Sequence, residues 1–378
     1  MMRIAYVSLD PGIPVWGSKG ASVHIQSMIR AFMGLGAKVT VFTPRPEGAR
    51  PPGFENVQVV TTPLPDSLDA QERALAQIEL DRRIPALIAG AGPYDMIYER
   101  HALFSCNAME TARNSGIAGV LEVNAPLIDE QTRHRILPLP DEARKSTDHA
   151  MMAARLVSVV SPAVGDYVRA HGAWQVLQMP NAIDPLDLPV SCEDRDGFTV
   201  GFVGSMKPWH DLDVLISAME LLDSALRTRL LIVGDGPERA RLAPRLDALQ
   251  AEVTGLLPHH EVPARLISMD VGIAPYSARQ DFYFSPLKIY EYMAAGLPVI
   301  ASAVGNLPEV VTHDRTGLIV PPDNPQALAN AITQLARDRA YGIRLGSAGR
   351  KHVEAKHTWH ENARHILRLS GLLKEDAT

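Results

Sequence analysis

The feature that most constrains the fold is an alternation of short apolar runs with helical segments. Residues 3–8 form such a run, and a glycine-containing loop follows it. The next segment carries apolar residues at helical spacing and ends at Gly34 and Gly36, before a second apolar run over residues 38–44. Short apolar runs indicate strands buried on both faces, and a strand–helix–strand order predicts a parallel pair with a right-handed crossover.

The alternation begins again after a polar, proline-containing linker at residues 185–197. With 378 residues, the chain is long enough for two domains. We expect an N-terminal domain over residues 1–184 and a C-terminal domain over 185–356, with the helix predicted at 357–378 packing back on the first domain. The predicted fold class is α/β, with two Rossmann-like, doubly wound domains facing a central cleft. Ligands of such sheets collect at the carboxyl ends of the strands.

Composition narrows the class of protein. Hydrophobic residues make up 46% and charged residues 21% of the chain, which is typical of a globular protein. The net charge is −6 and no basic block is present, so we expect no nucleic-acid partner. Cys106 and Cys192 match no metal or redox spacing. The chain has neither a long apolar run nor a signal-peptide pattern at its start, so we expect a soluble, cytoplasmic protein.

A helix predicted to begin at Pro286 and end before Gly296 carries two charges in an apolar setting. Ser285 is a good N-cap, and proline suits the first helical position. Lys288 falls in the first turn, where a cation is unfavourable unless an anion lies nearby. Glu291, one turn further along, could accept hydrogen bonds from sugar hydroxyls. The pattern therefore predicts a phosphate site, although an intrahelical ion pair between the two charges would also explain it.

Several segments, in order, resemble one enzyme family. They are "SKGASVHIQSMIRAFMGLGAKVTVFTP", "MPNAID", "GFVGSMKPWHDLDVLI", "LLIVGDGPER", "SPLKIYEYMAAGLPVIASAVGNLPEVV" and "TGLIVPPDNPQALANAI". Together they resemble the retaining glycosyltransferases of family 4, which have the GT-B fold. The resemblance implies an enzyme of the hexosyltransferase type that moves a sugar from a nucleotide-sugar co-substrate to an acceptor with retention, without a metal or another cofactor. It does not distinguish UDP, GDP or ADP.

The resemblance also assigns residues to the donor. Glu291 holds the position of the family's ribose-binding acid. Tyr283 stands where the family's first acid belongs, and Asp281 is a candidate replacement for that carboxylate. Backbone groups of the next segment would contact the donor sugar or phosphate; these residues are Phe284, Ser285, Pro286 and Leu287.

A cationic clamp is expected on the diphosphate. An ungapped alignment places Ser205 at the family's arginine position and His210 at its lysine position, and Lys207 lies between them. We expect Lys207 and Lys288 to stabilise the leaving group, with His210 close by. Glycine turns complete the predicted donor site, at Gly204, Gly234, Asp235 and Gly236. The D-x-D at residues 211–213 lies at a predicted helix start, where aspartate is expected as a cap, so no metal site is assigned.

The N-terminal domain is expected to bind the acceptor. Asn124 takes the place of a histidine that many family members carry, and His101 is a second candidate catalytic residue, although a lone histidine is more often structural. Glu122 is expected on the acceptor side. The loop with Gly17, Lys19 and Gly20 matches the family's paired glycines; a flexible surface loop would give the same pattern.

Other functions remain open. A sugar-nucleotide epimerase would need paired acids, for which Asp281 and Glu122 are candidates. A relative that binds nucleotide sugars without catalysis would explain the departures at Tyr283 and Asn124. A dehydrogenase is disfavoured because no G-x-G-x-x-G follows the first strand.

The acceptor is expected to be a saccharide, a lipid-linked compound or another small molecule. A helix predicted over residues 132–145 carries Arg133, His134 and Arg135. These residues could favour an anionic acceptor or a peripheral membrane contact, and a solvated helix face is the simpler interpretation. The oligomeric state is not indicated.

Overall fold

The computed structural model divides the chain into two compact units. The structure describes residues 1–65, 69–184, 197–258, 261–278 and 282–374. Unit 1 contains Met1–Asn181, Tyr283–Ser285 and Trp359–Thr378, and unit 2 contains Ala182–Phe282 and Pro286–Thr358. The predicted domain boundary follows residue 184, and most of the predicted linker lies outside the described residues.

Unit 1 is built on a parallel sheet of seven strands within its described residues, in the order β3-β2-β1-β4-β5-β6-β7. The strands are β1 (Arg3–Ser8), β2 (Lys38–Thr43), β3 (Gln58–Thr61), β4 (Met96–Arg100), β5 (Ala118–Val123), β6 (Leu156–Val159) and β7 (Val176–Gln178). The central strands β1, β4, β5 and β6 are mostly apolar and almost wholly buried, as expected of strands covered on both faces. The first predicted strand–helix–strand unit is therefore confirmed.

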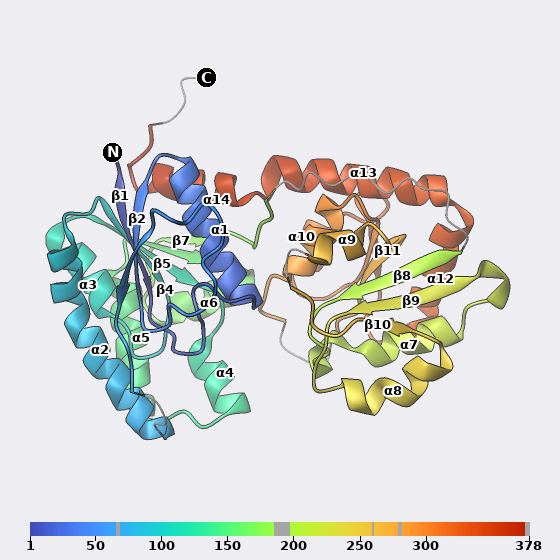
Figure 1. The fold of residues 1–378 in the computed structure, drawn as a ribbon, viewed down its shortest axis with the longest axis horizontal. Helices are drawn as coiled ribbons and strands as arrows, with labels where there is room; N and C mark the ends of the chain where they lie inside the picture. The colour runs from blue at the N-terminus through green and yellow to red at the C-terminus, as the bar shows by residue number, and fades with distance from the viewer. Residues whose placement is uncertain (66–68, 185–196, 259–260, 279–281, 375–378) are drawn as a thin grey trace. The chain divides into compact units, whose positions relative to one another are not determined.

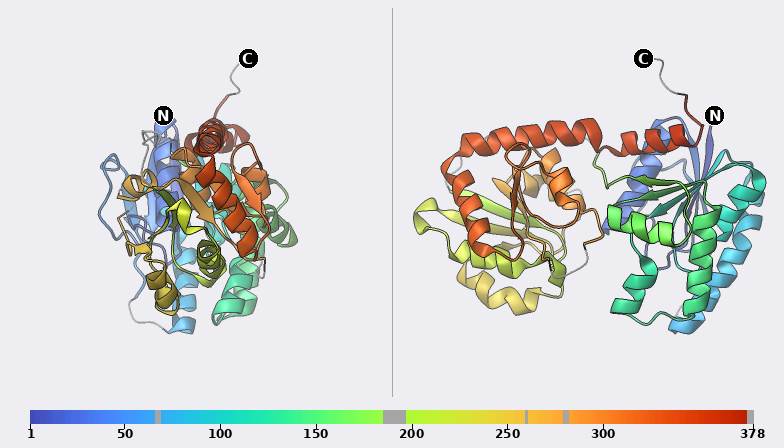
Figure 2. Two further views of the ribbon diagram at one scale, coloured as in Figure 1. Left: turned by 90° about the vertical axis from the view of Figure 1, so that its right-hand side faces the viewer. Right: turned by 180° about the vertical axis from the view of Figure 1, so that it is seen from behind.

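Helices cover both faces of this sheet. They are α1 (Gly20–Gly34), α2 (Ala70–Ala91), α3 (Asn107–Ser115), α4 (Leu127–His134), α5 (Pro140–Ala153), α6 (Pro162–Ala170) and α14 (Trp359–Leu369). Helices α2, α3 and α5 pack side by side on one face, and α1 packs with α14 on the other (Figures 1 and 2). The C-terminal helix α14 thus completes the layer begun by α1.

Unit 2 repeats the architecture. Its described residues form a parallel six-stranded sheet in the order β10-β9-β8-β11-β12-β13. The strands are β8 (Phe198–Val203), β9 (Thr228–Val233), β10 (Glu252–Val253), β11 (Val271–Ala274), β12 (Val299–Ser302) and β13 (Leu318–Val320). The prediction of two doubly wound α/β domains is confirmed.

The helices of unit 2 again form two layers. They are η1 (Pro208–His210), α7 (Leu212–Glu220), η2 (Ser224–Leu226), α8 (Arg239–Ala248), α9 (Val262–Leu266), α10 (Leu287–Ala294), α11 (Leu307–Val310), α12 (Pro325–Arg337) and α13 (Arg339–Lys356). Helix α7 packs against α8 and α12, whereas α10 packs against the long helix α13 (Figure 1). In the described part of the chain, no helix is both long and apolar enough to cross a membrane.

One predicted element is wrong. Residues 132–145 do not form a single helix, because α4 ends at His134 and α5 begins at Pro140. Pro138 and Pro140 lie in or next to this break, and proline disfavours helix in the residue before it. The basic residues 133–135 therefore lie at the end of α4.

Candidate functional site

Two glycine turns meet at the carboxyl end of the sheet in unit 2. Gly204 follows β8 and Gly234 follows β9, with φ values of +141° and +140°. A Cβ atom on Gly234 would lie 2.1 Å from the carbonyl oxygen of Gly204, and one on Gly236 would lie 2.5 Å from the nitrogen of Met206. The nitrogen of Met206 donates to the carbonyl of Asp235 at 3.0 Å. These close contacts require glycine and make the two turns one surface.

Lys288 reaches this surface from the first turn of α10. Its Nζ atom would lie 2.9 Å from a Cβ atom on Gly204, and it lies 3.9 Å from the centroid of the Phe202 ring and 5.4 Å from that of Tyr276. The side chain is buried, and Nζ has no hydrogen-bond partner among the described residues. Burial lowers the pKa of Lys288 to about 7, while the charge of Glu291 acts in the opposite direction. The ammonium group therefore does not form the alternative hydrogen-bonded ion pair with Glu291.

His210 completes this cluster in its neutral form. Its Nδ1 atom hydrogen-bonds to the carbonyl oxygen of Ser205. Burial, followed by the charges of Lys288 and Lys207, lowers the pKa of His210 to about 2. With Nδ1 protonated, Nε2 keeps its lone pair. Lys207 is partly buried, and its Nζ lies 5.7 Å from the centroid of the Trp209 ring. The structure thus brings these predicted residues together.

Tyr292 fixes the end of β8, a role that the sequence pattern did not reveal. Its hydroxyl accepts a hydrogen bond from the nitrogen of Val203 at 2.7 Å and lies 3.4 Å from the carbonyl of Ile273. Its ring fills the space beside Gly272, where a Cβ atom would lie 2.5 Å from it. Because Val203 directly precedes Gly204, Tyr292 holds the first glycine turn in place. The sequence signal that could have indicated this role is a tyrosine hydroxyl on a mostly apolar helix, where it needs a hydrogen-bond partner.

The start of α10 differs from the prediction. Pro286 is the N-cap, it makes no side-chain cap, and the helix begins at Leu287, so the assignment of Ser285 as N-cap is wrong. Ser285 instead belongs to unit 1. Its Oγ accepts from the nitrogen of Asn181 at 3.1 Å, and its carbonyl accepts from Asn181 Nδ2 at 2.6 Å. Asn181 lies in the "MPNAID" segment. Its backbone nitrogen binds the Ser285 hydroxyl oxygen that was predicted to cap α10.

Tyr283 and Phe284 also belong to unit 1. The carbonyl of Tyr283 accepts a hydrogen bond from Ser161 Oγ, and its ring meets that of Phe284 edge to face, with centroids 5.5 Å apart. The Tyr283 hydroxyl lies close enough to Glu130 on α4 to be affected by the charge of that carboxylate. Burial and the Glu130 charge raise the pKa of Tyr283 above its ordinary value. Asp281, the predicted replacement for the missing acid, lies outside the described residues.

Glu122 lies at the centre of a buried network in unit 1. It accepts hydrogen bonds from Tyr98, Arg100 and Asn124, and its Oε2 lies 3.0 Å from His24 Nε2. Burial alone would raise the pKa of Glu122, but the charges of His24 and Arg100 and these hydrogen bonds hold it well below its ordinary value. The carboxylate is therefore ionised and fully occupied. Asn124 is oriented by this contact.

His24 links the network to the 283–285 segment. Its Nδ1 lies 3.0 Å from Asn181 Oδ1, and its ring meets that of Trp359 at 4.5 Å between centroids. Asn181 in turn holds Ser285. The sequence pattern placed His24 on a predicted helix but gave it no role. The signal that could have indicated one is its polar ring among the apolar positions of that helix.

The remaining residues of the predicted acceptor side lie in two places. His101 is buried, both ring nitrogens lack a hydrogen-bond partner among the described residues, and burial lowers its pKa to about 4, with a further contribution from His171. Helix α1 begins at Gly20, and Lys19 is its exposed N-cap residue. Gly17 is held through its carbonyl, which accepts from Gln26 at 2.9 Å.

The D-x-D segment is occupied by structural contacts. The carboxylate of Asp213 forms an ion pair with Arg241 and a second with Arg245, at 3.2 Å. Asp211 occupies the N-cap position of α7, but its side chain makes no cap, so the expected capping hydrogen bond is absent. A carboxylate engaged by two arginines is a poor metal ligand.

Comparison with family models decides the classification. A model described as Glycosyltransferase Family 4 matches residues 18–185. A second, described as Glycosyl transferases group 1, matches residues 197–338. The chain belongs to glycosyltransferase family 4. One model matches each half of this family 4 member, and the two matches together cover most of the chain.

Two curated relatives illustrate the similarity. A GDP-mannose-dependent alpha-(1-6)-phosphatidylinositol monomannoside mannosyltransferase from Mycobacterium tuberculosis is 31% identical over 169 residues, which are 43% of this chain and 44% of that protein. The chain thus matches less than half the length of this relative. A 2-deoxystreptamine glucosyltransferase from Streptomyces kanamyceticus is 27% identical over 294 residues, 73% of this chain and 72% of that protein.

A solved structure shows the same fold. The Anabaena protein HepE, crystallised in complex with UDP, superposes with a TM-score of 0.73 at 18% identity, covering 98% of this chain and 100% of that one. The predicted GT-B fold is therefore confirmed.

Proposed function

We propose that this chain transfers a sugar from a nucleotide-sugar donor to an acceptor, without a metal and with retention of anomeric configuration. The observation that carries the proposal is the buried Lys288 ammonium group beside the two glycine turns, with no hydrogen-bond partner among the described residues. A buried cation without a partner is costly, and an anion would relieve that cost. The anion expected here is the diphosphate of a nucleotide.

The chemistry follows from this placement. When the bond between the donor sugar and the diphosphate breaks, negative charge develops on the departing oxygen. Lys288 and Lys207 supply fixed positive charge, and neutral His210 adds a polar ring without adding charge. We propose that Glu291 binds the hydroxyls of the nucleotide ribose, as the family resemblance implies. A cationic clamp of this kind performs the function that a metal ion performs elsewhere.

Retention requires that the new bond form on the face from which the leaving group departs, or that a covalent intermediate form. Glu122 is unsuited to attack the sugar, because four neighbouring groups occupy its carboxylate. This supports a front-face reaction. The acceptor oxygen bonds to the anomeric carbon as the bond to the diphosphate breaks, and the acceptor proton passes to a diphosphate oxygen.

A carboxylate is present at the segment where the family has its first acid. Tyr283 occupies the chain position, and the charge of Glu130 on α4 acts on its hydroxyl. We propose that Glu130 supplies the carboxylate that the tyrosine lacks and that it contacts the donor sugar. Asp281 remains the alternative indicated by the sequence.

The identities of the donor and the acceptor are proposed here only as chemical classes. The mycobacterial relative is named for GDP-mannose and the Anabaena protein was crystallised with UDP, so both nucleotides belong in a first screen, with ADP as a third. We propose a saccharide, a lipid-linked compound or a small molecule as acceptor, bound by unit 1. The basic end of α4, at Arg133 and Arg135, could receive an anionic acceptor or contact a membrane surface.

The decisive experiment follows release of nucleoside diphosphate from UDP-, GDP- and ADP-sugars, with and without a panel of acceptors. Release that depends on an acceptor, with an α-linked product from an α-linked donor, is expected. Lys288→Met should lower it by about 10²–10³-fold, and Lys351→Met, which changes an exposed lysine of the same unit, should leave it unchanged. The departure at Tyr283 favours one rival, a binding protein without catalysis. Tight binding with no release for any donor and acceptor pair would establish that rival.

A further inference from the structure

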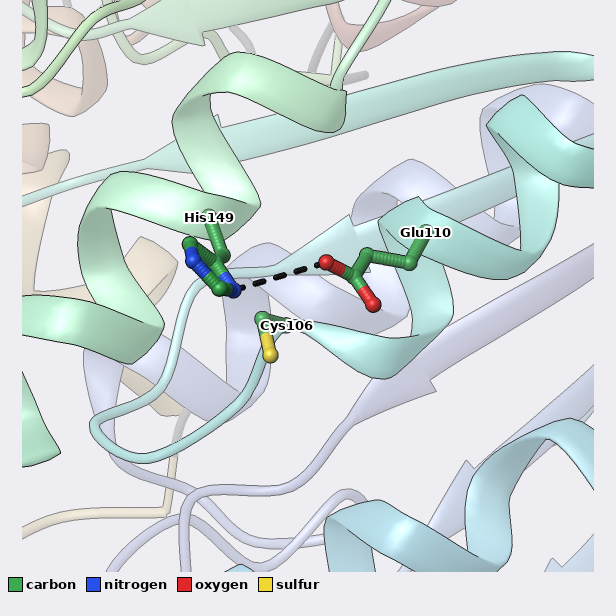
Figure 3. A group of neighbouring side chains, drawn as sticks. All are labelled: Cys106, Glu110 and His149. Atoms are coloured by element: carbon green, nitrogen blue, oxygen red, sulfur yellow. Dashed lines mark ion pairs between the residues drawn. The ribbon is translucent and has the colours of Figure 1, made fainter.

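We propose that Cys106, Glu110 and His149, none of which is assigned to the donor or the acceptor, form a binding site for Zn²⁺ in unit 1. One ligand atom from each residue lies within 4.8 Å of the others. Figure 3 shows the His149 ring facing the Glu110 carboxylate, with the Cys106 side chain beside them. Thiolate, imidazole and carboxylate are the three ligand types that zinc takes in proteins.

The helices bring the ligands together by their regular geometry. Cys106 is the N-cap of α3, and the nitrogen of Glu110 donates to its carbonyl at 3.0 Å, so the two residues stand one turn apart on one face. His149 lies on α5, which packs against α3. Its Nδ1 lies 3.5 Å from Glu110 Oε1. Ligand atoms of a tetrahedral zinc ion with bonds of about 2.0–2.3 Å stand at about this separation, so only small side-chain movements are needed.

The surroundings of the cluster suit a cation. Asp81 is buried beside the thiol, with Oδ2 3.7 Å from Cys106 Sγ. Asp81 also accepts from Asn107 Nδ2 at 2.6 Å, which fixes its negative charge beside the cluster. Arg113 forms an ion pair with Glu110 at 3.9 Å. The side chain of Arg113 is more than half exposed, so a metal ion can displace it from Glu110. The cluster therefore holds more acidic than basic groups.

The site is also accessible. The side chain of Glu110 is 30% exposed and that of His149 is 44% exposed, and Cys106 is partly buried. Three protein ligands would leave a fourth position for water. Binding would release the thiol proton to solvent and join the start of α3 to α5. These helices cover β4 and β5, so an ion here would stabilise unit 1.

The test uses the full chain, freed of metal with a chelator, reduced, and titrated with Co²⁺ as a spectroscopic probe. We expect about one ion per chain, with a near-ultraviolet thiolate-to-cobalt band and visible bands of tetrahedral coordination, and displacement by Zn²⁺. Cys106→Ser should abolish the thiolate band, and His149→Ala or Glu110→Gln should weaken binding at least tenfold. Cys192→Ser is the matched control and should leave the spectrum unchanged.

A second measurement covers variants that fold poorly. In the unmodified chain, Zn²⁺ should slow alkylation of Cys106 and leave that of Cys192 unchanged, as read by peptide mass spectrometry. The proposal is overturned if the thiolate band survives Cys106→Ser, if it depends on Cys192, if no band forms at millimolar Co²⁺, or if Zn²⁺ protects neither cysteine. Because these readouts need no donor or acceptor, they are independent of the proposed transfer reaction.

Discussion

The ammonium group of Lys288 lies 3.9 Å from the centroid of the Phe202 ring. The ring face attracts the cation, but this attraction replaces only part of the hydration that burial removes. Below about pH 7 the apo protein thus keeps a costly charge at the place where a diphosphate is expected. Stability and ligand binding should therefore respond in opposite directions when this charge is removed.

The first prediction concerns Lys288→Met, which keeps the length of the side chain and removes the charge. The apo variant should melt a few degrees higher than the unmodified chain, because the buried cation without a partner is gone. Sugar transfer should fall by about 10²–10³-fold, the usual loss when one fixed group that stabilises the leaving charge is deleted. Thermal melting and diphosphate release measure the two effects. A lower melting temperature together with unchanged transfer would contradict the assignment.

The second prediction is a pH dependence with a definite sign. The pKa of Lys288 is about 7 in the folded chain and 10.5 is its ordinary value, so between these values the unfolded chain binds a proton that the folded chain does not. The contribution of Lys288 to the free energy of unfolding therefore becomes more favourable as the pH rises through this window. The advantage of Lys288→Met in melting temperature should be largest below pH 7 and should shrink toward pH 10.

The same shift predicts proton uptake on binding. At pH 8.5 Lys288 is mostly neutral, and a diphosphate would favour its charged form, so binding of UDP or GDP should take up a proton. Calorimetry in buffers of different ionisation enthalpy measures this uptake. It should disappear in Lys288→Met and persist in Lys351→Met.

The sequence predicted the two sheets because their strands are short apolar runs with glycine at the ends, which is a local property. It also anticipated that Lys288, Lys207 and His210 lie near one another, since all three follow carboxyl ends of strands or start helices. Their role toward a diphosphate stays a prediction. The sequence-based prediction was wrong where a side chain has both a local and a distant hydrogen-bond partner available. Ser285 has a good cap sequence, yet Asn181 binds its oxygen from more than a hundred positions away.

Long-range polar contacts explain the rest of what the sequence missed. No spacing rule relates His24 to Glu122, Tyr292 to Val203, or Glu130 to Tyr283, because each pair is brought together only by the completed sheet. The zinc ligands show the same limit. Cys106 and Glu110 are four residues apart, but His149 joins them only through the packing of α5 on α3.

The fourth prediction concerns Glu122→Gln, which tests whether this acid acts in folding. The variant leaves Arg100 buried without its carboxylate and should lose about 3 kcal/mol of unfolding free energy at pH 7. Because the folded pKa of Glu122 is depressed, this stabilisation is present above pH 4.5, its ordinary value, and is lost as the pH falls below it. Asp166→Asn, which breaks an exposed ion pair with Arg169, should change stability by less than about 1 kcal/mol. Denaturant melts at pH 7 and pH 4 measure both; equal stability of Glu122→Gln and the unmodified chain would show that the network is dispensable.

The last prediction separates the two candidate replacements for the missing acid. If Glu130 contacts the donor sugar and Tyr283 is only its neighbour, Glu130→Gln should lower kcat/KM by about 10²-fold, while Tyr283→Phe should cost less, because it removes no charge from the site. Both variants should bind free UDP or GDP as the unmodified chain does, since the diphosphate cluster is intact. Asp129→Asn, at the neighbouring exposed acid on α4, is the matched control and should retain full activity. Loss of transfer in Asp281→Asn with normal transfer in Glu130→Gln would assign the role to Asp281.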